Sequence, residues 1–240
     1  MDLKKLQPRP KAVRYLANYL ALFLGSIMTK LKVSGRHHIP RRGPFIVACN
    51  HFSILDPALV LYGIQRPVNF LMATDQIVDP LFIWAPWLYG YIPTDRRQLA
   101  PSTIKQALKA LERKEVVGIF PEGYSQSTVL RPAKRGAIYL AQTMAVPILP
   151  VAIQGAESLW DNWLRGNRPS LRVRIGRPYR LPPYLPGRDR RQDWLRRQGD
   201  DLMVRIAALL PESYHGLYRG HPQITVYRSE NRLALPSDSG

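Results

Sequence analysis

Cysteine is nearly absent from this chain of 240 residues, which contains only Cys49. A single thiol excludes a disulfide within the chain and a cysteine-rich zinc site. The sequence also has no internal repeat, no glycine-rich nucleotide-binding loop and no residues at metal-ligand spacing. We therefore expect neither a metal nor a cofactor. Cys49 lies in an apolar run, where we interpret it as a small core residue.

Acidic residues are scarce. The chain has 17 Asp and Glu against 35 Lys and Arg, which gives a formal net charge of +18. Such a surplus predicts an anionic partner: nucleic acid, anionic lipid headgroups or a phosphorylated substrate. Arginine suits phosphate recognition but does not choose among the three. The basic residues are not interleaved with stacking aromatics as in a nucleic-acid module, which argues against nucleic acid.

No apolar run is long enough to cross a bilayer. The longest uncharged stretch near the N-terminus is residues 15–29, YLANYLALFLGSIMT, with basic residues on both sides. As a helix it would span about 22 Å, short of the roughly 30 Å hydrocarbon core. We expect a basic arm and a membrane-associated helix over residues 1–31, with the helix lying in one leaflet. A buried core helix is the alternative, and a signal peptide is disfavoured because no small-x-small cleavage site follows.

The rest of the chain alternates short apolar runs with amphipathic segments. Strand-like runs lie at residues 44–49, 68–73, 116–120, 147–153 and 171–175, and helical patterns at 57–62, 102–115, 134–144 and 193–210. We interpret residues 32–44 as a loop. The rhythm predicts an α/β fold with a mostly parallel, mixed sheet flanked by helices. We expect one domain over residues 32–220 and a loose polar tail over residues 221–240.

Polar residues follow the first of these strands in the stretch ACNHFSILDPALV, residues 48–60. Asp56 with Pro57 behind it is a common helix start, so Asp56 is expected to be an N-cap. His51 could be an ordinary loop histidine or a general base near neutral pH, with a nearby carboxylate fixing its tautomer. On one helix the two side chains would point about 140° apart. They can meet if His51 lies in the turn before the helix.

Four short signals occur in order along the chain: Asn50-His51-x4-Asp56, Gly90-x4-Asp95-Arg96, Phe120-Pro121-Glu122-Gly123 and residues 146–151, VPILPV. Lys134-x-Gly136 follows the third. Together they resemble the lysophosphatidic acid acyltransferase family of phospholipid and glycerol acyltransferases over roughly residues 30–180. The apolar N-terminal helix is similar to the membrane-associated start of that family.

The resemblance implies roles for particular residues. His51 would be the general base and Asp56 its partner, and Ser53 would not be a nucleophile because attack on the thioester is direct. The resemblance implies substrate binding by a set of six residues: Asn50, Arg96, Glu122, Gly123, Lys134 and Gly136. Within this set Arg96 would hold the acceptor phosphate, and Glu122 would accept hydrogen bonds from glycerol hydroxyls.

One departure from the family concerns the acceptor. After Phe-Pro-Glu-Gly the family commonly has Thr-Arg-Ser, whereas this chain has Tyr124-Ser125-Gln126-Ser127. The arginine expected at position 125 is absent. Either Arg131, Lys134 or Arg96 holds the phosphate, or the acceptor is not lysophosphatidic acid.

The sequence therefore predicts an O-acyltransferase on the cytoplasmic face of the cell membrane. It would move a fatty acyl group from acyl-CoA or acyl-carrier protein to a lysophospholipid, making phosphatidic acid from lysophosphatidic acid. The same chemistry on a lyso-ornithine lipid, a glycolipid or glycerol phosphate is the nearest alternative. A lipid hydrolase and a non-enzymatic basic protein that binds membranes or nucleic acid are the others. An aromatic segment, residues 81–93, is explained in part by core packing and also fits a membrane-interface surface or an acyl-chain pocket.

Overall fold

The structure, a computed structural model, describes residues 9–73, 91–94, 100–123, 127–184 and 188–233. Its centre is a seven-stranded sheet in the order β1-β7-β6-β2-β5-β3-β4. The strands are β1 (Lys30–Ser34), β2 (Phe45–Cys49), β3 (Val68–Ala73), β4 (Ile92–Thr94), β5 (Val116–Ile119), β6 (Ile148–Gln154) and β7 (Ser170–Ile175).

Most neighbouring strands run parallel, and β6 and β7 form the antiparallel pair of the described sheet. The predicted mostly parallel, mixed α/β sheet is confirmed. Every residue of β2 is buried, because helices cover both faces of the sheet. A strand covered on both faces has a continuous apolar sequence rather than an alternating one.

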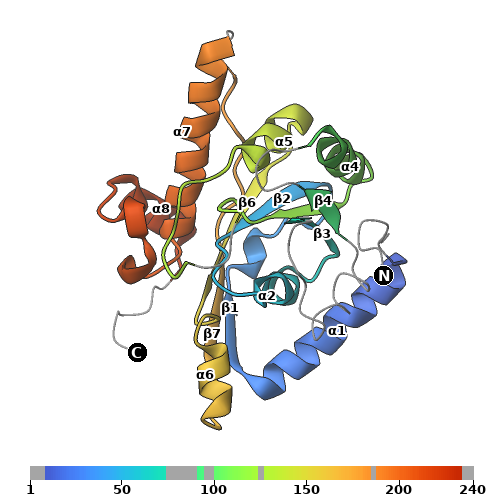
Figure 1. Cartoon of the computed structure of the whole chain (residues 1–240), viewed down its shortest axis with the longest axis vertical. Helices are drawn as coiled ribbons and strands as arrows, with labels where there is room; N and C mark the ends of the chain where they lie inside the picture. Colours follow the sequence, from blue (N-terminus) through green and yellow to red (C-terminus); the bar gives the residue numbers. More distant parts are fainter. Residues whose placement is uncertain (1–8, 74–90, 95–99, 124–126, 185–187, 234–240) are drawn as a thin grey trace.

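Helices cover the two faces of the sheet in separate layers (Figure 1). Their bounds are α1 (Lys11–Met28), α2 (Asp56–Ile64), α4 (Pro101–Glu112), α5 (Gly136–Met144), α6 (Leu159–Leu164), α7 (Arg188–Ala207) and α8 (Gln223–Asn231). Side chains of α4, α5, α7 and α8 build the core on one face, and those of α2 and α6, with Ala17 of α1, build the core on the other.

Helix α1 contacts the domain through Arg14, Ala17 and Gly25, and the large apolar side chains of this helix that the structure describes are exposed. A Cβ added at Gly25 would lie 3.5 Å from the Tyr62 ring of α2. Arg14 is buried and donates to the carbonyl of Val68 at 3.1 Å. By contrast Leu16 and Phe23 are 70% and 61% exposed. A helix is found where the sequence predicted one, and its membrane association stays a prediction. The exposure of Leu16 and Phe23 contradicts the alternative that the helix is buried in the core.

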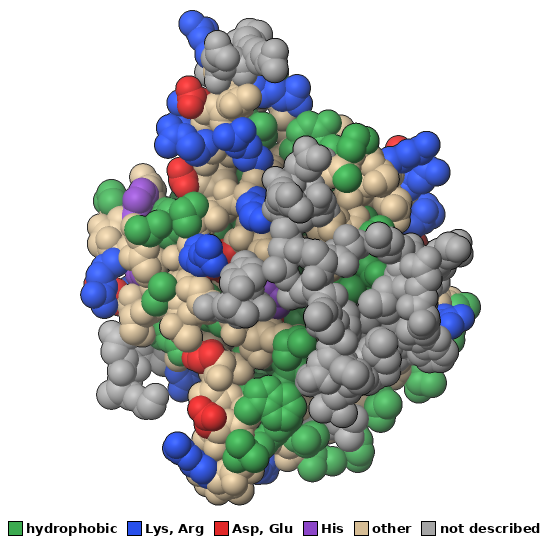
Figure 2. Space-filling model, viewed as in Figure 1, with side chains coloured by type: hydrophobic (Ala, Val, Ile, Leu, Met, Phe, Trp, Pro, Cys, Tyr) green, Lys and Arg blue, Asp and Glu red, His purple; other side chains and the backbone are tan. Residues whose placement is uncertain are grey.

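The exposed apolar side chains of α1 form a row. Leu16, Tyr19, Leu20, Phe23 and Ile27 are each more than half exposed, and their spacing of three or four residues places them on one face of the helix. Hydrophobic side chains gather along α1 at the lower edge of the molecule in Figure 2. Within the part of the chain that the structure describes, no helix is long and apolar enough to cross a membrane.

Two sequence-based expectations differ from the structure. Residues 30–34, partly expected to be loop, form β1, which gains its backbone partners from β7 at the edge of the sheet. The loose tail expected from residue 221 is wrong for Gln223–Asn231, which form α8. Ile224 and Tyr227 of α8 are buried in the core, because this helix packs against α7 although its sequence is mostly polar. The remaining boundaries of the expected parts stay predictions.

Candidate active site

The candidate site lies where two neighbouring strands end. β2 and β5 are parallel, and their register pairs Ala48 with Ile119. The residues that follow, Asn50-His51 after β2 and Phe120 to Gly123 after β5, therefore leave the same edge of the sheet. This edge, outside the carboxyl ends of parallel strands, is the usual position of ligands in such folds.

His51 and Asp56 meet at this edge. The Nδ1 atom of His51 lies 3.0 Å from Oδ2 of Asp56, and the two side chains are 16% and 0% exposed. The same Oδ2 accepts hydrogen bonds from the backbone N–H groups of Phe52 at 2.7 Å and Ser53 at 2.8 Å. The turn that follows β2 is thus wrapped around one carboxylate oxygen.

Asp56 was expected to be the N-cap of the following helix, and this expectation is wrong. Asp56 is the first residue of α2, and no side chain caps that helix by a hydrogen bond. Its carboxylate points back to the preceding turn instead of forward to the helix N–H groups. The helix start still depends on the sequence as predicted, since Pro57 occupies the first turn, where its missing N–H is harmless.

The electrostatics of the pair suit a base held in one tautomer. Burial raises the pKa of the Asp56 carboxyl, and hydrogen bonds from His51, Ser53 and Phe52 oppose that rise. With the carboxylate ionised, the imidazole donates Nδ1–H to Asp56 and keeps a lone pair on Nε2. A proton taken up at Nε2 would then be stabilised by a charge that is buried and cannot move away.

Phe120 holds the imidazole from one side, a role that our sequence reasoning missed. The ring of His51 stacks on that of Phe120 with centroids 4.1 Å apart and an interplanar angle of 22°. Phe120 stacks in turn on Phe70 of β3, with centroids 5.7 Å apart. The Phe-Pro-Glu-Gly motif contained the signal, because the residue after β5 must face the residues after β2 in a parallel pair.

Glu122 supports the turn through the backbone. Its Oε1 accepts from the N–H of His51 and its Oε2 from the N–H of Arg131, each at 3.1 Å. The side chain is only 4% exposed. Burial raises the pKa of Glu122 to about 7, although both of these hydrogen bonds oppose the rise. Both carboxylate oxygens therefore have a backbone partner, and one of these partners is the N–H of His51.

Gly123 allows the chain to turn under Lys134. Its φ of +68° lies in the left-handed region, and a Cβ there would come within 2.8 Å of Cε and Nζ of Lys134. The exposed Lys134 side chain therefore crosses directly over Gly123, and its backbone N–H donates to Pro121 at 2.8 Å. Gly136 is the first residue of α5. The third motif and the Lys134 segment lie together, as their order in the sequence predicts.

Asn50 and Cys49 are parts of the scaffold. Asn50 is fully buried, and its amide both donates to the carbonyl of Ile153 at 2.9 Å and accepts from its N–H at 2.8 Å. This pair of hydrogen bonds ties the end of β2 to β6. Burial raises the pKa of the Cys49 thiol, which is 1% exposed. The interpretation of Cys49 as a core residue is confirmed.

Three predicted features fall outside the described residues. They are Arg96, the Tyr124-Ser125-Gln126 departure from the family motif and most of the aromatic segment, residues 81–90. Of that segment, Tyr91, Ile92 and Pro93 are described; Tyr91 and Ile92 are buried and Pro93 is half-buried. The positions expected for phosphate binding that the structure does describe are Lys134 and Arg131.

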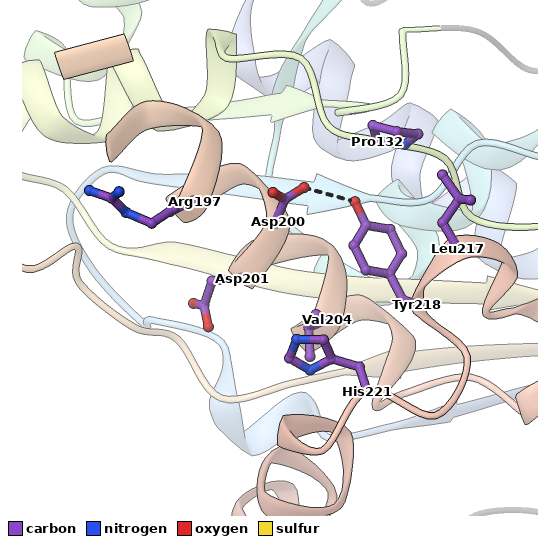
Figure 3. Close-up of a pocket in the computed structure, with 8 residues that line it drawn as sticks. All are labelled: Pro132, Arg197, Asp200, Asp201, Val204, Leu217, Tyr218 and His221. Atoms are coloured by element: carbon purple, nitrogen blue, oxygen red, sulfur yellow. Dashed lines mark hydrogen bonds between the residues drawn. The ribbon is translucent and has the colours of Figure 1, made fainter. Parts of the chain in front are cut away.

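A separate surface pocket of about 460 Å³ lies between α7 and the turn at residues 216–218 (Figure 3). Tyr218 donates from its hydroxyl to Asp200 at 3.2 Å across this pocket. The described residues that line it include none of the predicted site residues. Pro132 on its rim follows Arg131, so the pocket adjoins the loop that Glu122 holds.

Comparisons with known proteins agree on one family. A family model described as Acyltransferase matches residues 30–154. A 1-acyl-sn-glycerol-3-phosphate acyltransferase of Bacillus subtilis is 30% identical over 181 residues, which cover 74% of this chain and 88% of that one. The human 1-acyl-sn-glycerol-3-phosphate acyltransferase alpha is 30% identical over 55% of this chain, and the match spans 48% of the human protein.

The fold is shared with a solved structure. The crystal structure of the 1-acyl-sn-glycerophosphate acyltransferase PlsC from Thermotoga maritima superposes with a TM-score of 0.55 over 79% of this chain and 80% of that chain. The sequence identity of 20% makes this a likeness of fold alone.

Proposed function

This chain belongs to the lysophosphatidic acid acyltransferase family and is an acyltransferase, and we propose that it esterifies the free hydroxyl of lysophosphatidic acid to form phosphatidic acid. The acyl donor would be acyl-CoA or acyl-carrier protein. The relatives from Bacillus subtilis and human carry this activity in their names. The observation that carries the proposal here is the 3.0 Å contact between His51 and Asp56 at the carboxyl edge of the sheet.

His51 is proposed as the general base. As the acceptor oxygen attacks the thioester carbonyl, its proton passes to Nε2, and the imidazolium is stabilised by Asp56. The tetrahedral intermediate then breaks its carbon–sulfur bond, and the departing thiolate takes the proton from His51. The base is regenerated, and no acyl-enzyme is formed. The expectation that the reaction needs no cofactor or metal stays a prediction.

The acceptor phosphate is proposed to bind near Gly123. Lys134 over Gly123 offers an ammonium group, and Arg131 and Arg96 are the guanidinium candidates. Gly136 and Gly123 let the backbone approach a ligand. We assign Glu122 and Asn50 a positioning role, because their buried polar atoms already have backbone partners.

We also propose that the protein works at the cytoplasmic face of the cell membrane. The row of exposed apolar residues on α1 would insert among the lipids, and the net charge of +18 would favour anionic headgroups. Each well-placed basic residue contributes about 1 kcal/mol to such binding. An enzyme held this way meets an acceptor that is itself part of the bilayer.

The test is acyl transfer by the purified protein. With labelled acyl donor and lysophosphatidic acid we expect labelled phosphatidic acid, and His51→Ala should lower the rate by about 10²–10⁴-fold. His37→Ala, at an exposed histidine outside the site, is the matched control and should keep the rate. Equal rates for His51→Ala and the parent would overturn the assigned base. Fatty acid released without an acceptor would identify a hydrolase instead.

Ser125 stands where the family commonly has arginine. This difference favours, as the second candidate, an acceptor other than lysophosphatidic acid. A lyso-ornithine lipid, a glycolipid and glycerol phosphate belong in one panel with lysophosphatidic acid. The largest kcat/KM identifies the acceptor. A preference for lyso-ornithine lipid would keep the reaction and replace the proposed substrate.

A further inference from the structure

Helix α6 is a short surface helix that carries large apolar side chains on the outside. Leu159 is buried and holds the helix to the core, whereas Trp160 is 42% and Leu164 87% exposed. Trp160 and Leu164 are four residues apart and therefore lie on the same face of the helix. Single exposed apolar side chains are ordinary on a protein surface, whereas a contiguous apolar patch marks a surface that contacts a partner or a membrane.

The exposed face of α6 is continuous with that of α1. The indole N–H of Trp163 donates to the carbonyl of Met28, the last residue of α1, at 3.1 Å. Arg168, in the turn after α6, donates to the carbonyls of Ser26 at 2.7 Å and Thr29 at 3.1 Å. Hydrophobic side chains run from α6 along α1 on the lower edge of the molecule (Figure 2).

Basic residues border this apolar surface. Lys30, Arg165 and Arg168 are exposed beside the end of α1 and α6, against one acidic residue within α6, Asp161. An apolar centre with a basic border and an interfacial tryptophan matches the layering of a bilayer with anionic headgroups. A protein partner would not require an apolar centre bordered by basic residues.

We propose that α6 is a second membrane contact, which together with α1 fixes the orientation of the enzyme on an anionic phospholipid bilayer. The inference rests on the proposed membrane association of α1. One inserted helix leaves the domain free to roll about the helix axis. α1 and α6 point in different directions (Figure 1), so contact through both removes that rotation and holds the domain in one orientation on the membrane surface.

The test uses Leu164→Asp and vesicles of phosphatidylglycerol and phosphatidylcholine. From the fraction bound in co-sedimentation, we expect the partition of Leu164→Asp onto the vesicles to be at least about tenfold weaker than that of the parent. An aspartate on the contact face loses apolar burial and is repelled by anionic lipid. The matched control is Leu217→Asp, at a leucine that is 76% exposed near α7. It should bind as the parent does. Thermal unfolding of both variants should match the parent, because both positions are exposed.

A second measurement separates docking from catalysis. Leu164→Asp should keep the parental rate with a short-chain lysolipid dissolved below its micelle-forming concentration, and lose rate with acceptor embedded in vesicles. Equal vesicle binding by Leu164→Asp and the parent would overturn the proposal, as would a loss of rate with the dissolved acceptor. If the parent forms an oligomer in lipid-free solution and Leu164→Asp does not, the surface contacts a second copy of the chain, and this result would also overturn the proposal. If the parent transfers no acyl group at all, the proposed function fails, while the sedimentation result still decides the role of α6.

Discussion

The carboxyl edge of β2 and the outer surface of α1 and α6 depart from ordinary burial in opposite ways. At the edge, Asp56 and Glu122 are carboxylates with exposures of 0% and 4%. On α1, Leu16 and Phe23 are apolar side chains with exposures of 70% and 61%. The same domain thus buries charge in one place and exposes hydrocarbon in another, and both arrangements cost stability in water.

The two departures are supported in different ways. At the edge, Asp56 and Glu122 accept hydrogen bonds from backbone N–H groups within the chain. On α1 and α6, the described contacts hold only the inner side and the ends of the helices, as at Gly25 and Met28. The difference teaches that the buried carboxylates at the edge of β2 find backbone partners within the fold, whereas Leu16 and Phe23 of α1 and Leu164 of α6 stay mostly exposed within the described part of the chain.

The largest effect is expected where buried charge serves the base. Asp56→Asn should lower kcat by about 10²–10⁴-fold, since a neutral amide no longer stabilises the imidazolium and does not hold the same tautomer. Steady-state transfer rates measure it, with Asp193→Asn at an exposed position as the control. A loss below about threefold would show that Asp56 only shapes the turn.

An intermediate effect is expected on the free energy of unfolding, which should depend on pH through the ionisation of Glu122. Its folded-state pKa of about 7 exceeds its unfolded value of about 4.3, so the folded state holds the proton more tightly. The stability contributed by this group is therefore complete below about pH 4 and is lost as pH rises through about 7. The full loss is on the order of 3 kcal/mol in the free energy of unfolding.

Glu122→Gln removes this titration. The difference in unfolding free energy between the parent and Glu122→Gln, measured in urea from pH 4.5 to 8, should move against the parent as pH rises. A pH-independent difference would contradict the raised pKa. The comparison with Asp56→Asn separates the group that supports the backbone from the group that supports the imidazole.

The smallest effect on stability is expected on α1. Phe23→Ser should change the free energy of unfolding by about 0.5 kcal/mol or less, because the ring is 61% exposed. Phe45→Ala in β2, where the ring is 0% exposed, should cost about 3–5 kcal/mol. Chemical denaturation compares the two. Phe23→Ser should instead weaken binding to anionic vesicles, and unchanged binding would count against the membrane role of α1.

Much of this architecture follows from local patterns. The apolar runs that became β2, β5 and β6 were predicted from the sequence because a strand covered on both faces must be apolar throughout. β7 was predicted from the alternation of apolar residues with arginine in residues 171–175. Helix geometry allowed His51 and Asp56 to meet only with His51 in the turn before the helix, and the structure has that arrangement. Helix α8 was missed, because its polar sequence contributes only Ile224 and Tyr227 to the core.

The sequence by itself determined the central strands and most of the helices that flank them, and it indicated an apolar helix near the N-terminus. Only the tertiary structure decided that Asp56 turns back to bind Phe52 and Ser53, that Glu122 holds His51 and Arg131, and that α6 joins the surface of α1. Patterns of period two and 3.6 report which way side chains face within one element. Contacts between residues 71 or 135 positions apart depend on strand order and packing, which no local period contains.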